Sequence, residues 1–252
     1  MMLTPERTKQ LLAESGAMEE GHFVGTSGVH FSLYVRKDRA TRLPRVASEL
    51  CAGIAERFVG YDIDVVVAPA IGVIPLSTWT AHHLTRLRPD YPEVPALYTE
   101  YEEVVLGEGI AGGDPLIVTL SSGHAFGVAE GEKIILRRAR FMLKRGFSED
   151  VRGRRVLAVE DILTTGGSAR GTARAIIDAG SILVGLAALV NGGGVTAVKI
   201  GVDRLEALVN IERQIFTEEE CALHGLCAQG IPINVEIGHG AAFLARKRAM
   251  AG

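Results

Sequence analysis

Apolar residues follow helical and strand-like spacings in alternation along most of the chain. Positions 43–58 carry apolar residues at intervals of three and four, which is typical of an amphipathic helix packed on a core. The run 64–68 is continuous and rich in valine, as in strands that are buried on both faces. Further strands are predicted at 94–98, 156–159 and 182–190, and further helices at 5–12, 75–87 and 167–179.

This alternation predicts an α/β fold, a doubly wound and mainly parallel sheet with helices on both faces and ligands at the carboxyl ends of its strands. The pattern loosens between residues 103 and 153 into glycine-rich and charged pieces, with hairpin strands expected at 116–120 and 133–136. We expect residues 103–153 to form a mobile excursion from the core. After Asn191 the chain is irregular, with one helix predicted near 217–224.

Composition and charge narrow the class of protein. The 252 residues are 47% apolar and 23% charged, which fits one globular domain with an appendage or two small domains. A net charge of -3 provides no general basic field, so neither nucleic acid nor a membrane is an expected partner. The apolar stretches are far shorter than the roughly 20 residues of a membrane span, and the N-terminus lacks an apolar signal core. Three cysteines are too few for a disulfide framework, so the expectation is a cytoplasmic protein.

The segment 155–168, RVLAVEDILTTGGS, joins an apolar strand to two acids and then to a small, hydroxyl-rich and glycine-rich turn before a helix. The N–H groups and hydroxyls of such a turn suit a phosphate at a helix N-terminus. The residues expected to bind it are Thr164, Thr165, Gly166, Gly167 and Ser168. Glu160 and Asp161 lie beside this turn, and their carboxylates would repel a phosphate, so they need another role. They suit the hydroxyls of a ribose, which they could bind directly or through Mg²⁺.

Other interpretations of this segment are available. A buried strand that simply enters a turn, with its acids at the start of a helix, is the structural alternative. A Walker-type site would need Gly-Lys-Ser/Thr in the turn, and a Rossmann site would need GxGxxG after the strand. The segment contains neither pattern.

The same segment closely resembles the phosphoribosyl-pyrophosphate motif of type I phosphoribosyltransferases. Other patches are similar to the orotate branch of that family, in which residues 22–32 would form a hood over the base and 64–76 the first core strand and pyrophosphate loop. Similar patches follow at 96–100, 143–147 and 219–232.

The resemblance also implies a division of the chain. Residues 1–42 would form an N-terminal helix and hood segment, and 43–190 the core. The core would include a flexible loop or insertion at about 103–153, with the inserted part at about 103–142. Residues 191–252 would form a C-terminal segment and tail.

The implied function is a homodimeric enzyme that uses Mg²⁺ and transfers ribose 5-phosphate from 5-phosphoribosyl-1-pyrophosphate to a nitrogenous base, releasing pyrophosphate. Its transition state would be oxocarbenium-like, so catalysis would consist of positioning and of stabilising the leaving pyrophosphate. The implied catalytic residues are Glu160, Asp161, Lys144 and Arg145, with Asp161 also a candidate Mg²⁺ ligand. The implied pyrophosphate contacts are Ala70, Ile71 and Gly72, and the implied base contacts are Thr26, Ser27, Gly28 and Phe31.

The residues leave the acceptor base open. The resemblance favours orotate, with orotidine 5′-monophosphate as the product and pyrimidine biosynthesis as the pathway. However, Asn191 and Gly192 stand where that branch often has a base-contacting Asp-Arg pair, and residues 102–131 contain neither lysine nor arginine. The alternatives are transfer to another base, or a non-catalytic regulator that binds phosphoribosyl pyrophosphate.

Cys221, His224 and Cys227 have a spacing that would suit three soft metal ligands. No fourth ligand is evident, and a zinc site needs tetrahedral closure. We therefore expect this segment to be a compact tail packed on the hood.

Overall fold

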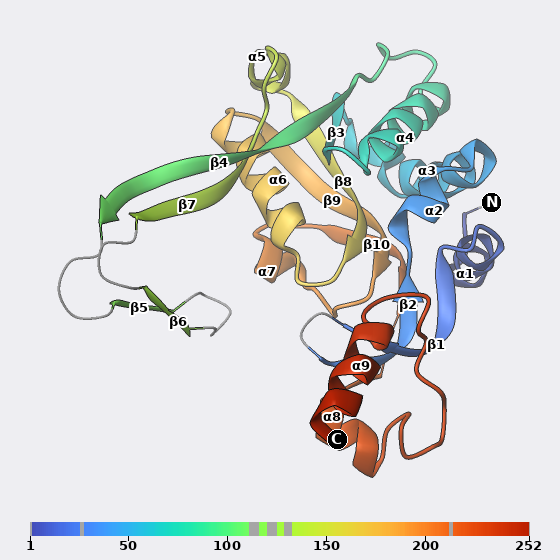
Figure 1. Ribbon diagram of the computed structural model, residues 1–252. Coiled ribbons are helices and arrows are strands. Elements are labelled where there is room, and N and C mark those ends of the chain that lie inside the picture. Colours follow the sequence, from blue (N-terminus) through green and yellow to red (C-terminus); the bar gives the residue numbers. More distant parts are fainter. Residues whose placement is uncertain are drawn as a thin grey trace.

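The computed structural model describes residues 2–25, 28–110, 116–119, 125–128, 133–211 and 214–251. Its centre is a six-stranded sheet with the strand order β10-β9-β8-β3-β4-β7 (Figure 1). The strands are β3 (Val65–Pro69), β4 (Ala96–Ile110), β7 (Lys133–Met142), β8 (Arg155–Leu163), β9 (Ile182–Asn191) and β10 (Leu205–Asn210). All neighbouring pairs are parallel except β4 and β7. The predicted α/β fold with a mainly parallel sheet is confirmed.

Alternate residues of β3 face two separate apolar layers, which explains its unbroken run of valines. Val66 and Ala68 pack in one layer and Val65 and Val67 in the other. The first layer contains α1 (Pro5–Glu14), α3 (Pro44–Phe58) and α4 (Ile74–Leu87). The second contains α5 (Phe147–Val151), α6 (Gly167–Asp178) and α7 (Ala197–Ile200). The short α2 (Lys37–Thr41) precedes α3, and η1 (Val59–Tyr61) follows it.

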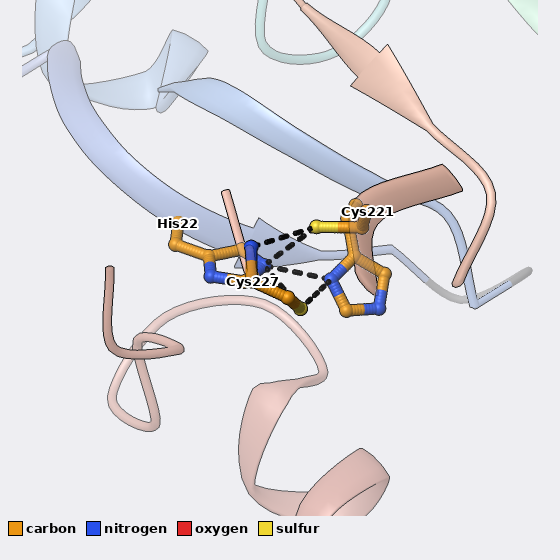
Figure 2. Close-up of side chains that lie close together, drawn as sticks. His22, Cys221 and Cys227 are labelled. Carbon is orange, nitrogen blue, oxygen red and sulfur yellow. Dashed lines mark hydrogen bonds between the residues drawn. The ribbon is translucent and has the colours of Figure 1, made fainter. Parts of the chain in front are cut away.

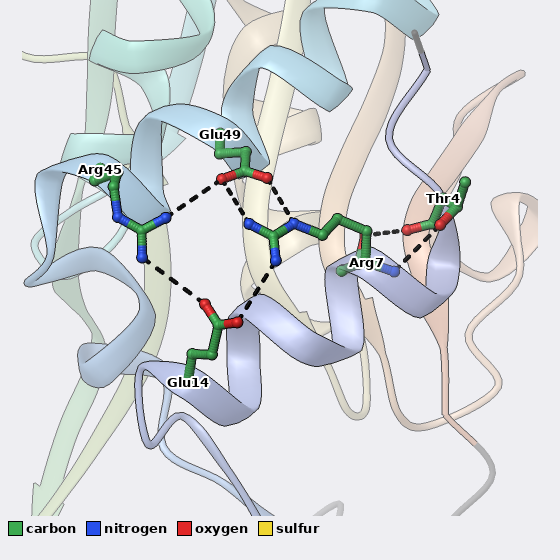
Figure 3. A network of polar contacts seen from close by, with 6 residues as sticks. Thr4, Arg7, Glu14, Arg45 and Glu49 are labelled. Carbon is green, nitrogen blue, oxygen red and sulfur yellow. Dashed lines mark hydrogen bonds and ion pairs between the residues drawn. The ribbon is translucent and has the colours of Figure 1, made fainter.

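Polar contacts fasten α1 to α3 (Figure 3). The Arg7 guanidinium donates from Nε to Glu49 Oε1 at 2.8 Å and from Nη2 to Glu49 Oε2 at 3.1 Å. Arg45 pairs with Glu49 at 3.6 Å and with Glu14 at 3.8 Å, and Glu14 also pairs with Arg7 at 3.5 Å. Because these side chains are partly exposed, the network orients α1 more than it stabilises the fold. Among the helices of the described residues, none combines the length and apolar character that a membrane span requires.

A separate antiparallel sheet, which we call the hood, consists of β1 (Met18–Val24), β2 (His30–Val35) and β11 (Ile215–Phe216). Its third strand comes from the C-terminal part of the chain. α8 (Glu218–Leu223), α9 (Gly240–Ala251) and the tail between them lie beside the hood (Figure 1). The Asn234 N–H donates to the His22 carbonyl at 2.7 Å, so the tail packs on the hood as expected.

β4 and β7 continue beyond the core as a long antiparallel ribbon (Figure 1). The predicted end of the first of these strands at Tyr98 is wrong, because β4 runs along its partner to Ile110. The strand expected at 133–136 exists, but it continues to Met142 and pairs with β4. A separate pair is formed by β5 (Leu116–Thr119) and β6 (Ala125–Val128). The strand expected at 116–120 is confirmed by β5. The extension of β4 and its pairing with β7 depend on backbone hydrogen bonds, which need no apolar periodicity, so the sequence pattern did not show them.

Candidate active site

The turn 164–168 connects β8 to α6, and its geometry suits an anion. Gly166 precedes the first residue of α6 with a φ of 78°, a left-handed conformation that glycine adopts without strain. No side chain caps this end of α6 among the described residues. The first backbone N–H groups of the helix therefore remain available to a phosphate, where the helix dipole also favours negative charge.

The loop 191–195 supports this turn from behind. The N–H groups of Gly192 and Gly193 both donate to the Leu163 carbonyl, at 3.0 and 2.9 Å. A Cβ atom on Gly193 would lie 1.7 Å from the Thr164 carbonyl oxygen, so only glycine fits there. Asn191 holds the loop closed, since its amide donates to the Val195 carbonyl and accepts from the Val195 N–H, both at 2.9 Å. Gly193 was not among the predicted site residues, although three consecutive glycines at 192–194 were a visible signal.

The acid pair lies at the end of β8, beside the start of α6. Glu160 and Asp161 are only 3% and 4% exposed. Glu160 accepts from the Ser168 hydroxyl at 2.6 Å and from the Asp161 N–H at 3.0 Å. Asp161 accepts from the Ile162 N–H at 2.7 Å. The Ser168 hydroxyl is thus committed to Glu160, which leaves the backbone N–H of Ser168 as its group available to an anion.

Burial has a direct electrostatic consequence for Glu160. Removal from water, together with the neighbouring charge of Asp161, raises the pKa of Glu160 to about 7. The hydrogen bond from Ser168 acts in the opposite direction but does not offset the burial. A carboxyl group with this pKa changes its charge near neutral pH.

The loop after β3 reaches the same edge of the sheet, because β3 and β8 are parallel neighbours. The Ala70 N–H donates to the Thr99 carbonyl at 2.8 Å, so this group is part of the sheet. The N–H groups of Ile71 and Gly72 make no hydrogen bond within the described part of the chain. Ile71 is 84% exposed, and the Ala70–Ile71 peptide bond is cis. Of the three residues selected from the sequence, Ile71 and Gly72 retain N–H groups that are available to pyrophosphate oxygens.

A small cavity of about 120 Å³ separates the hood from the ends of β8 and β9. Phe31 and Tyr34 of β2 line it on one side, and Ile162, Thr164 and Gly192 on the other. The Phe31 ring is stacked with those of Phe23 and Tyr34, at centroid distances of 5.9 and 6.0 Å. This stacking holds an aromatic face beside the 164–168 turn, as a flat heterocycle would require.

The other predicted base contacts lie just before β2. Gly28 has a φ of 80°, and its N–H donates to the Gly25 carbonyl at 3.0 Å. Gly28 thus lies just before β2 with its N–H committed to Gly25. Thr26 and Ser27 lie outside the described residues.

The two predicted catalytic cations, Lys144 and Arg145, lie beside β4. Lys144 Nζ lies 3.3 Å from Glu102 Oε1, and Arg145 Nε lies 2.6 Å from Glu100 Oε1. Neither side chain lines the small cavity. In this conformation both cations are therefore paired with carboxylates of β4.

A larger open cleft of about 1200 Å³ lies between the ribbon and α6. Gly167 and Ser168 are among its lining residues, together with Arg140 of β7 and Arg170 of α6. Both arginines are exposed and bring positive charge near the turn. Neither arginine was among the predicted site residues, because the pairing of β7 with β4, which brings the ribbon beside α6, was not predicted.

Comparison with known proteins agrees with this geometry. Residues 41–215 match the family model described as phosphoribosyl transferase domain. The orotate phosphoribosyltransferase of Pelotomaculum thermopropionicum is 32% identical over 230 residues, which cover 91% of this chain and 95% of the relative. That of Caldicellulosiruptor bescii is 28% identical over 224 residues, covering 89% and 92%.

A solved structure shares the fold. The orotate phosphoribosyltransferase of Mycobacterium tuberculosis H37Rv, crystallised with Fe(III) dicitrate, superimposes with a TM-score of 0.53. The two chains are 22% identical, and the match covers 82% of this chain and 97% of the other. At this identity the likeness concerns the fold alone.

Proposed function

The chain belongs to the type I phosphoribosyltransferase family, in its orotate phosphoribosyltransferase branch, and we propose that it converts orotate and phosphoribosyl pyrophosphate into orotidine 5′-monophosphate and pyrophosphate. The observation that carries the proposal is the convergence of three features at one edge of the sheet. These are the uncapped start of α6, the buried acid pair and the aromatic cavity under the hood. We further propose that the enzyme acts in the cytoplasm as a homodimer.

Each feature has a role in holding the substrates. The N–H groups of the 164–168 turn and the hydroxyls of Thr164 and Thr165 would bind the 5′-phosphate. Glu160 and Asp161 would accept hydrogen bonds from the ribose hydroxyls, and the N–H groups of Ile71 and Gly72 would donate to the pyrophosphate. The base would lie against Phe31 in the small cavity.

Magnesium fits the donor set of this site, because Mg²⁺ prefers oxygen ligands and takes one or two carboxylates along with substrate phosphates. The two oxygens of Glu160 already accept from Ser168 and from the Asp161 N–H. Asp161 is the candidate ligand that the resemblance to the family implies. When bound, Mg²⁺ would supply positive charge to the pyrophosphate group.

In the reaction the bond from ribose C1′ to a pyrophosphate oxygen breaks, a bond from C1′ to a ring nitrogen of the base forms, and that nitrogen releases its proton. The protein contributes by holding both reactants in line and by donating N–H groups where negative charge develops on pyrophosphate. Lys144 and Arg145 would add charge to the leaving group after exchanging their glutamate partners for phosphate. Arg140 and Arg170 would add positive charge on the cleft side.

The cavity under the hood has a volume of about 120 Å³, whereas pockets that enclose an entire small-molecule ligand are usually several times larger. This volume favours a base with a single ring. Two observations motivate the alternatives. Gly192 offers no guanidinium to pair with the carboxylate of orotate, which favours another base. The absence of lysine and arginine from residues 102–131 favours a regulator that binds phosphoribosyl pyrophosphate without turning it over.

A pyrophosphate-release assay separates these functions. The protein would be incubated with phosphoribosyl pyrophosphate, Mg²⁺ and, in turn, orotate, uracil and the purine bases. We expect release with orotate, and a loss of most of it in Asp161→Asn, while the exposed acid variant Asp90→Asn keeps the full rate. If pyrophosphate were released only with a different base, that base and not orotate would be the acceptor. Tight binding of phosphoribosyl pyrophosphate in calorimetry without release with any base would favour the regulator.

A further inference from the structure

A cluster of metal-ligating side chains lies outside the proposed active site, between the hood and the tail (Figure 2). It consists of His22 on β1, His30 on β2, Cys221 in α8 and Cys227 just after α8. One ligand atom from each of these residues lies within 4.8 Å of all the others. Four residues from distant parts of the sequence thus direct their nitrogen and sulfur atoms at a common point.

The distances within the cluster are close to those of a tetrahedral zinc site. Cys221 Sγ lies 3.6 Å from His22 Nε2, and Cys227 Sγ lies 3.8 Å from His22 Nε2 and 3.7 Å from His30 Nδ1. Zn–N bonds of about 2.0 Å and Zn–S bonds of about 2.3 Å place tetrahedral ligand atoms about 3.3 to 3.8 Å apart. His22 Nε2 and His30 Nδ1 lie only 2.7 Å apart and would have to separate, while every pair of ligand atoms lies within 4.8 Å.

The surroundings of the cluster direct the lone pair of His22 towards its centre and favour a thiolate at Cys221. His22 Nδ1 lies 2.8 Å from the Ile231 carbonyl, which only accepts, so Nδ1 carries the proton and Nε2 presents its lone pair to the cluster. The Cys227 N–H donates to Cys221 Sγ at 3.2 Å, a contact that stabilises a thiolate. A proton shared between His22 and His30 would satisfy that pair of nitrogens, but it would not account for the convergence of two sulfur atoms on them.

We propose that His22, His30, Cys221 and Cys227 bind one Zn²⁺ ion in a tetrahedral His₂Cys₂ site. Four protein ligands leave no open coordination position, so the role is structural rather than catalytic. The set of sulfur and imidazole ligands also differs from the oxygen ligands that Mg²⁺ requires. The ion would join the two long hood strands to the C-terminal tail.

This site differs from the ligand set considered from the sequence. His224 is exposed, and its ring packs against Phe216 at a centroid distance of 5.9 Å. The ligands that complete the set, His22 and His30, lie about 200 positions earlier in the chain. Because Phe31 follows His30 on β2 and lines the small cavity, the ion would also fix the strand that presents the aromatic face to the base.

Metal content tests the proposal on the full chain without a histidine tag. The protein would be produced in zinc-supplemented medium, kept reduced and dialysed against metal-free buffer before elemental analysis. We expect one zinc ion per chain, and a fall to near zero in Cys221→Ser and Cys227→Ser. The controls Cys51→Ala and His224→Asn change the remaining cysteine and the neighbouring histidine, and both should keep the ion.

Cobalt provides a second readout that needs no variant. After removal of zinc, Co²⁺ added to the wild-type chain should give the strong visible absorption of tetrahedral cobalt, with sulfur-to-cobalt charge transfer in the near ultraviolet. Stoichiometric Zn²⁺ should then abolish both signals. A reduced wild-type protein that retains no zinc and gives no tetrahedral cobalt spectrum would overturn the proposal, as would zinc retention by both cysteine variants. None of these outcomes depends on transferase activity.

Discussion

Replacing Glu160 by glutamine should stabilise the free protein at alkaline pH, because the wild-type site must bury a carboxylate there. Glu160 is 3% exposed, and its pKa is raised to about 7 from an ordinary value of 4.5. A group whose pKa is higher in the folded protein than in the unfolded chain stabilises the fold at pH values below its pKa in the unfolded chain. That stabilisation is lost as the pH rises through its pKa in the folded protein. For Glu160 the stabilisation is therefore lost between pH 4.5 and about 7.

The magnitude follows from the pKa difference. A difference of about 2.5 between folded and unfolded chains corresponds to roughly 3 kcal/mol of unfolding free energy lost by about pH 8. Glutamine carries no charge to bury and keeps an oxygen that accepts from the Ser168 hydroxyl. Relative to wild type, Glu160→Gln should thus gain up to roughly 3 kcal/mol as the pH rises across this window.

Urea unfolding, followed by far-ultraviolet circular dichroism, measures this gain at several pH values from about 5 to 8. The exposed acid variant Glu93→Gln is the matched control, and its difference from wild type should stay flat with pH. If the difference between Glu160→Gln and wild type is the same at both ends of the range, Glu160 ionises without a burial cost and the reasoning fails. The same variant should lose affinity for phosphoribosyl pyrophosphate in calorimetry.

Two further predictions concern the turn and the hood. Gly193→Ala should weaken the binding of phosphoribosyl pyrophosphate at least about tenfold in calorimetry, a loss of about 1.4 kcal/mol, because the added Cβ would lie 1.7 Å from the Thr164 carbonyl oxygen. Gly192→Ala, whose Cβ would meet only Val190 at 4.0 Å, is the control, and equal effects of both variants would contradict this account. Phe31→Ala should raise the KM for the base by about tenfold while changing that for phosphoribosyl pyrophosphate little, as steady-state kinetics with each substrate varied would show. Equal rises in both KM values would instead indicate a general distortion of the hood.

Local sequence patterns predicted the parts of the fold that local physics determines. The valine run before Ala70 indicated a strand buried on both faces, and the two apolar layers on β3 explain why. The segment 155–168 is contiguous, so its strand, acids and turn could be recognised together. The long extension of β4 could not, because it depends on pairing with a strand that begins at Lys133.

Contacts between distant residues account for what the sequence analysis missed in the site. Gly193 and Thr164 are far apart in the chain, and only the parallel pairing of β8 and β9 brings them into contact. The same holds for the hood, where two histidines of β1 and β2 meet two cysteines of the tail. Spacing along the chain had pointed to His224, which is a neighbour in sequence but not in the cluster.

The most direct test of the proposed active site is a crystal structure of the protein with phosphoribosyl pyrophosphate and Mg²⁺. The account predicts the 5′-phosphate at the 164–168 turn, the ribose hydroxyls on Glu160 and Asp161, and the pyrophosphate at Ile71 and Gly72. Clear density for the ligand at any other place, with the turn empty, would contradict it.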